Sequence, residues 1–68
     1  MNKFSIHSFQ ITETGKWRPS ATLQLLEPNG IHIQEASFDQ IFDTKEEADN
    51  FARVHFTSLG YIESDRMS

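Results

Sequence analysis

The chain has 68 residues, a formal net charge of -4 and no cysteine. This length predicts one small domain, and a domain of about 60 residues buries only about 60% of the surface of its unfolded chain. The lack of cysteine excludes disulfide bonds and thiolate metal sites. We therefore expect a core that depends on packing alone, or on packing plus a partner chain.

The six Lys and Arg residues are scattered along the chain. Proteins that bind nucleic acid usually cluster such residues to displace phosphate counterions, so nucleic acid is not the favoured partner. The opening segment MNKFSIHSFQ lacks the apolar stretch of a signal peptide. No apolar run approaches the roughly 20 residues that span a bilayer. These features predict a cytoplasmic protein with no membrane partner.

The first predicted strand, KFSIHSFQIT, changes phase part-way along. Phe4 and Ile6 share one parity, whereas Phe9 and Ile11 share the other. Side chains of a strand alternate between faces, so the core face must switch near residues 7–8 unless both faces are covered. We favour a bulge or a strong bend at that point. Cover of both faces by a dimer is the alternative.

Two more strands are predicted after the turn TETGK. The second strand covers residues 17–26, and Pro19 places its start at an edge or a bulge because proline has no amide donor. The turn EPNG leads into a third strand over residues 31–38, with Ile31 and Ile33 on the face expected to meet the helix. The next segment, FDQIF, fits a short fourth strand or a packed connection.

The segment FDTKEEADNFARVHFTSLGY predicts a helix with its own start and end signals. Thr44 followed by Glu47 forms a capping box. Gly60 stands where a left-handed residue closes a helix, with Tyr61 folding back on Phe56. At about 100° per residue, one side of this helix carries an apolar stripe of Ala48, Phe51, Ala52, His55, Phe56 and Leu59.

These elements together predict an α+β domain over residues 1–62 with a flexible C-terminal tail over residues 63–68. The expected architecture is an antiparallel three- or four-stranded β-meander with one C-terminal α-helix packed on one face, β-β-β(-β)-α. One helix cannot cover both faces of a sheet. The second face is therefore expected to be polar or an interface.

Three histidines can together bind a metal ion when the fold brings them to one place. His7, His32 and His55 lie on separate elements without a ligand spacing, so neither a metal nor a cofactor is predicted. His32 has the parity opposite to Ile31 and Ile33 and is expected to point away from the helix. We expect His55, in the middle of the stripe, to be a neutral core residue with a hydrogen-bond partner. The alternative is a pH-sensitive residue or a ligand contact.

Trp17 is the one aromatic residue between two cations, Lys16 and Arg18. Such a group stacks on a base while its cations contact phosphate in single-strand binders. The favoured interpretation is that Trp17 begins a strand and covers the edge of a small core. These three residues and His55 are the candidate partner or ligand contacts.

Motifs for nucleophilic catalysis, phosphate binding and dinucleotide binding are missing from the chain. No pair of acidic residues is placed for general acid–base work. The sequence therefore predicts no catalytic residue, and we do not expect an enzyme.

The pattern F-x-[ST]-x-E-E-A, formed here by Phe42, Thr44, Glu46, Glu47 and Ala48, follows the predicted sheet. It resembles the helix start of small bacterial meander-plus-helix domains, many of them uncharacterised families. Similar topologies include dimeric single-stranded-DNA-binding domains. Because this chain lacks a basic sheet face, the resemblance implies a fold but carries over no binding residues.

The chain contains more apolar groups than one helical lid can cover. We therefore expect a protein–protein interaction or regulatory module that acts as a homodimer or binds another protein. A single-stranded nucleic-acid-binding module that uses Lys16, Trp17 and Arg18 is one alternative. A small-ligand or metal-binding accessory protein is the other.

Overall fold

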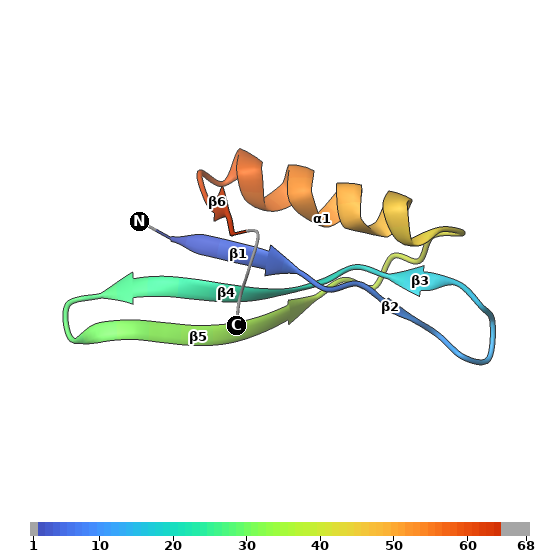
Figure 1. The fold of residues 1–68 in the computed structure, drawn as a ribbon, viewed down its shortest axis with the longest axis horizontal. Coiled ribbons are helices and arrows are strands. Elements are labelled where there is room, and N and C mark those ends of the chain that lie inside the picture. The colour runs from blue at the N-terminus through green and yellow to red at the C-terminus, as the bar shows by residue number, and fades with distance from the viewer. Residues whose placement is uncertain (1, 65–68) are drawn as a thin grey trace.

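The computed structural model describes residues 2–64 and shows the expected α+β class. One helix lies along an open sheet whose strand order is β5-β4-β1-β6, and a separate two-stranded sheet pairs β2 with β3 (Figure 1). The elements are β1 (Lys3–Ile6), β2 (Phe9–Gln10), β3 (Trp17–Arg18), β4 (Ser20–Glu27), β5 (Gly30–Ser37), α1 (Lys45–Ser58) and β6 (Ile62–Glu63). Among the described residues, no helix is long and apolar enough to cross a membrane.

The first hairpin keeps one register across the gap that separates β1 from β2. Ile6 lies opposite Ala21, and Phe9 lies opposite Arg18, three residues further along each strand. No residue is inserted in either strand, so of the predicted bulge or strong bend the bulge is wrong. The ladder is interrupted instead at Pro19, which has no amide hydrogen to donate.

The apolar residues before and after the change of phase therefore lie on opposite faces of one hairpin. Phe4 is fully buried, whereas Phe9 is 46% exposed. Because the register is unbroken, the apolar residues that follow the phase change are left on the face away from the helix.

The core forms where α1 crosses the middle strands. Ala48, Ala52 and Phe56 are its buried residues, four positions apart, and they face the sheet. The core cluster also contains Phe4 and Leu23. Helix α1 packs against β1, β3, β4 and β6, and it lies beside β1 on the side away from β5 (Figure 1). The half of the sheet nearest β5 is thus left without a helical cover.

Both ends of α1 follow the sequence prediction. The Thr44 hydroxyl oxygen accepts a hydrogen bond from the amide of Glu47 at 3.2 Å and donates to the Glu47 carboxylate at 3.1 Å. At the other end, the Tyr61 amide donates to the Phe56 carbonyl at 3.1 Å, and Gly60 adopts φ 89°. This is the Schellman arrangement, and it turns the chain back toward the sheet.

A short strand after the helix was not predicted. β6 pairs in parallel with β1, and the Ser64 amide donates to the Phe4 carbonyl at 2.7 Å. The Arg53 guanidinium also binds the Glu63 carboxylate through two nitrogens, at 2.9 and 3.2 Å. The first two residues of the expected tail are therefore part of the fold, and residues 65–68 lie outside the described range.

The side chains of β5 that lie on the same face as α1 are not the ones that the sequence predicted. Gln34 pairs with the core residue Leu23 and shares its face, and His32 follows the same alternation. Ile31 and Ile33 therefore lie on the face away from α1. The prediction that these two isoleucines meet the helix and that His32 points away is wrong, because pairing with β4 fixes which face each β5 residue occupies.

Candidate functional site

An apolar patch lies on the outer face of the sheet, defined here as the face away from α1. Leu26 and Ile31 are direct cross-strand partners, and Ile33 follows on the same face of β5. They are 54%, 60% and 53% exposed. These three residues form the outer apolar patch. A contiguous apolar surface of this kind on a small protein is typical of an interaction site.

The outer edge of β5 adjoins this patch and has no strand beside it among the described residues. The two-residue turn after Glu27 makes the pair of Glu27 and Gly30 a hydrogen-bonded one. Hydrogen-bonded and non-bonded pairs alternate from there. The amides and carbonyls of Ile31, Ile33 and Glu35 consequently point away from β4. The Leu26 amide, which donates to Asn2 Oδ1 at 2.9 Å rather than to β5, fits this alternation.

β5 also lacks most of the features that usually protect an edge strand, and its one charged side chain is Glu35. Such strands are commonly short, bulged, or interrupted by proline or lysine. β5 spans eight residues with the sequence GIHIQEAS, which contains no proline and no basic residue other than histidine. Its register with β4 is continuous from Gly30 to Ser37. A continuous, exposed edge of this length is open to pairing with another strand.

A polar cluster crosses the outer face beside the patch. The Thr22 hydroxyl donates to Glu35 Oε2 at 2.7 Å, and His7 Nε2 lies 2.8 Å from the Thr22 oxygen. His7 Nε2 also lies 3.2 Å from Glu35 Oε1. These contacts join three neighbouring strands or their ends, and they direct the Glu35 carboxylate toward β4 rather than toward the open edge.

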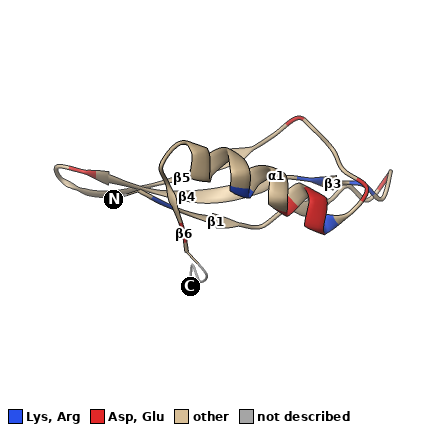
Figure 2. Ribbon diagram, turned by 90° about the horizontal axis from the view of Figure 1, so that it is seen from above, with Lys and Arg blue, Asp and Glu red and all other residues tan. Residues whose placement is uncertain are grey.

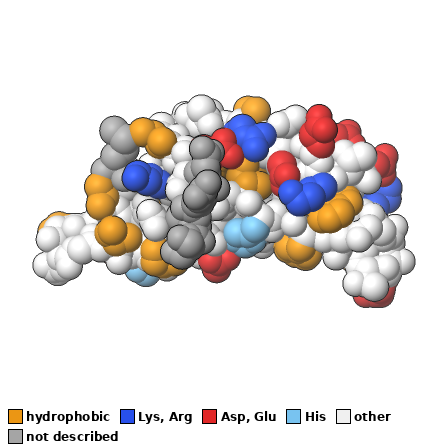
Figure 3. Space-filling view, viewed as in Figure 1, with side chains coloured by type: hydrophobic (Ala, Val, Ile, Leu, Met, Phe, Trp, Pro, Cys, Tyr) orange, Lys and Arg blue, Asp and Glu red, His pale blue; other side chains and the backbone are white. Residues whose placement is uncertain are grey.

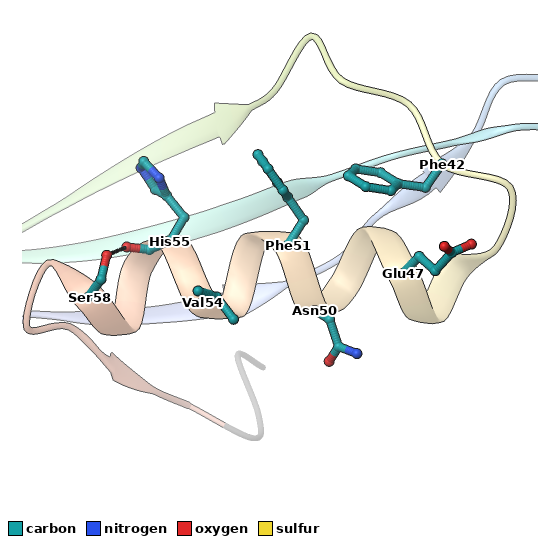
Figure 4. Close-up of a pocket in the computed structure, with 7 residues that line it drawn as sticks. All are labelled: Phe42, Glu47, Asn50, Phe51, Val54, His55 and Ser58. Carbon is teal, nitrogen blue, oxygen red and sulfur yellow. Dashed lines mark hydrogen bonds between the residues drawn. The ribbon is translucent and has the colours of Figure 1, made fainter.

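A shallow groove of about 660 Å³ runs along the exposed side of α1. The rings of Phe42, Phe51 and His55 stand in a row on one side of the helix, and Val54 lies on its outer surface (Figure 4). The full lining is Phe42, Glu47, Asn50, Phe51, Val54, His55 and Ser58. Phe38 supports this row through edge contact with Phe51, at 5.1 Å between ring centroids.

The structure corrects the prediction that His55 is a core residue. His55 is exposed at the groove. Its ring meets Phe38 and Phe56 edge-on, with centroid distances of 4.9 and 5.0 Å. The apolar stripe on α1 is wider than the part of the helix that contacts the sheet. On α1, only Ala48, Ala52 and Phe56 are buried. His55 thus belongs to a surface groove that a ligand or partner can reach.

The GKWRP segment is built into the fold rather than presented as an open platform. Trp17 is half-buried, and its backbone exchanges two hydrogen bonds with Phe42, at 2.7 and 2.8 Å. Lys16 Nζ lies 2.5 Å from Asp43 Oδ1. The Arg18 Nε is buried without a hydrogen-bond acceptor among the described residues. This geometry fits the interpretation of Trp17 as the cover of a core edge.

Acidic charge is concentrated at the start of α1. Acidic residues lie in the first turn of α1 (Figure 2), and acidic side chains gather toward that end of the surface in Figure 3. The hydrogen bond and the charge of Lys16 hold the pKa of Asp43 below its usual value. In residues 2–64 no group of three His, Cys, Asp or Glu side chains is placed to hold a metal ion. The three histidines lie on the outer face, on the helix side of β5 and on α1.

Of the predicted contacts, Lys16, Trp17 and Arg18 lie together on β3 and before it, whereas His55 lies in the separate groove on α1. The outer apolar patch was missed as a site. The turn EPNG sets the hairpin register and puts Ile31 opposite Leu26, out of phase with Leu23 and Leu25, but only the tertiary structure shows that the face of Leu23 is the one that meets the helix.

Comparisons of the chain with protein-family models, with curated proteins and with solved structures found no match. The function proposed for this chain therefore rests on its own geometry.

Proposed function

We propose that this chain is a protein–protein interaction module that acts as a homodimer, with the β5 edge and the outer apolar patch as its docking surface. One observation carries the proposal: an eight-residue edge strand without proline, lysine or a bulge adjoins side chains that are more than half exposed. Strand addition satisfies the free amides and carbonyls, and burial of the neighbouring side chains adds a hydrophobic contribution.

The chemistry of this surface favours another polypeptide strand over a small molecule. An open edge offers a row of backbone donors and acceptors at a two-residue spacing, which another extended strand matches. The outer apolar patch itself contains no charged side chain, so a second copy brings no like charges into contact there. A homodimer is also the commonest symmetric assembly of a single chain.

Molar mass in solution tests the proposal. Sedimentation or light scattering from micromolar to millimolar concentration is expected to show an average mass that rises from 7.9 kDa toward twice that value. The double variant Ile31→Thr/Ile33→Thr keeps β-branched side chains but removes apolar area from the docking surface. It is expected to remain monomeric over the same range.

Val54→Thr is the matched control, because Val54 is 68% exposed but lies on α1, away from β5. This variant is expected to associate as the parent does. A parent protein that remains at 7.9 kDa throughout the concentration range contradicts the homodimer. Equal loss of association in Val54→Thr would move the interface from β5 to the helix.

A further inference from the structure

Resting on the proposed homodimer, we infer that two copies pair their β5 strands antiparallel around a two-fold axis that passes between Ile33 and the partner's Ile33. The proposed function requires only that the open edge and its patch be used. The order of residues along β5 determines where along the strand the two-fold axis lies.

Only residues whose backbone groups point outward can bond across the new edge. These are Ile31, Ile33, Glu35 and, by the same alternation, Ser37. In an antiparallel pair related by a two-fold axis, outward-pointing residues of one copy lie opposite outward-pointing residues of the other. One residue near the middle of β5 therefore lies directly opposite its own copy, and the axis passes between the two. Residues 32, 33, 34 and 35 are the possible centres.

The other three centres are disfavoured, two by the side chains that they set opposite each other and one by a short overlap. A centre at Glu35 sets two carboxylates directly opposite, and like charges in that position destabilise a sheet. A centre at Gln34 sets Ile33 opposite the partner's Glu35 and places no isoleucine opposite another isoleucine. A centre at His32 sets Ile31 opposite the partner's Ile33 but aligns only residues 30–34, because β5 begins at Gly30, directly after the turn.

The centre at Ile33 aligns residues 30–36 of both strands and places two apolar side chains opposite each other on the outer face. Ile31 then lies opposite the partner's Glu35. The Glu35 carboxylate is drawn inward by Thr22 at 2.7 Å and His7 at 3.2 Å, so it does not obstruct that position. Side chains from both copies extend the outer apolar patch across the axis.

This arrangement also agrees with the position of the helix. A two-fold axis of this kind runs perpendicular to the sheet, so both copies of α1 lie on one side and both patches on the other. α1 lies beside β1 and away from β5 (Figure 1). The approaching partner therefore meets strand edge first, and no helix has to move.

Disulfide trapping tests the axis, because the parent chain has no cysteine. Opposed Cα atoms in a hydrogen-bonded antiparallel pair are about 5.5 Å apart, within the range that a disulfide spans. Ile33→Cys alone is expected to form a covalent dimer under mild oxidation. Ile31→Cys mixed with Glu35→Cys is expected to give a mixed disulfide, whereas each of these two variants alone gives little.

Glu13→Cys, in the exposed turn between β2 and β3, measures random collision. Thermal melting of each reduced variant checks that the fold is retained. Faster trapping through His32→Cys or Gln34→Cys than through Ile33→Cys overturns the proposed axis and leaves the homodimer standing. Mass doubling of the parent without trapping at any of these β5 positions also overturns it. A parent that never doubles its mass contradicts the homodimer itself.

Discussion

The ring of Phe4 in β1 lies against the ring of Phe56 in α1, with 5.4 Å between their centroids. Phe4 is fully buried and Phe56 is 4% exposed. This pair joins the first strand of the sheet to the last turn of the helix. The small interior of the protein is centred on it, with Ala21, Leu23 and Ala52 completing the buried cluster.

Truncation of this contact is expected to be severe. Phe56→Ala removes a ring that also contacts Phe38 and Tyr61, and such a change in a core costs about 3–5 kcal/mol. Because a domain of this size has a free energy of unfolding of only about 5 kcal/mol, we expect the variant to be largely unfolded. Urea denaturation followed by circular dichroism measures the loss. Leu59→Ala, at a residue that is 58% exposed, is the control and should retain the native fold.

The N-cap of α1 provides a smaller and better-defined effect. Thr44→Ala removes the oxygen that accepts from the Glu47 amide, and loss of an N-cap costs about 1 kcal/mol. Thr44→Ser keeps that oxygen and is expected to stay close to the parent. Chemical denaturation of the three proteins side by side gives the comparison. Equal stability of the alanine and serine variants would refute a capping role for the hydroxyl.

Acid is expected to weaken the fold through Asp49. Burial raises the pKa of this carboxyl, but the nearby Ser8 hydroxyl, the hydrogen bond and charge of Lys45 and the charge of Arg53 lower it overall. A carboxyl whose pKa is lower in the folded state contributes stability above its unfolded pKa of about 3.9. That contribution is lost as pH falls through the lower, folded-state value.

The expected difference in unfolding midpoint between the parent and Asp49→Asn is therefore largest near neutral pH and shrinks below about pH 4. Denaturation at a series of pH values measures it. Asp39→Asn, at an exposed position in the connection before α1, serves as a control for the general effect of removing one negative charge. A midpoint difference for Asp49→Asn that is constant down to pH 2 would contradict this account.

Trp17 is the single tryptophan and reports on the nucleic-acid alternative. Its half-buried position and its backbone bonds to Phe42 lead us to expect no change in its fluorescence on addition of single-stranded oligonucleotides at low salt. Lys16→Ala is the companion variant, since it removes the cation that pairs with Asp43. Quenching that weakens with added salt and with Lys16→Ala would revive base stacking as a function.

The helix ends and the turns could be predicted from short stretches of the sequence. The helix could be predicted with its cap at Thr44 and its left-handed end at Gly60, because capping depends on residues within one turn of each other. The two hairpin turns and the interruption at Pro19 could be predicted for the same reason. The α+β class followed from the order of these elements.

Side-chain placement across the sheet depended on contacts between distant parts of the chain. His55 is exposed because α1 covers β1 and β4 but not β5, and no local pattern states how far a sheet extends beneath a helix. β6 pairs with β1 from the opposite end of the chain, which only a closed tertiary structure can bring about.

The sequence by itself thus determined where strands turn and where the helix begins and ends, since these depend on backbone preferences of neighbouring residues. Tertiary structure alone decided which side of β5 meets the helix. A strand has two equivalent faces, and only its pairing with β4, whose Leu23 is held in the core, sends Ile31 and Ile33 outward. The candidate docking surface exists for that reason.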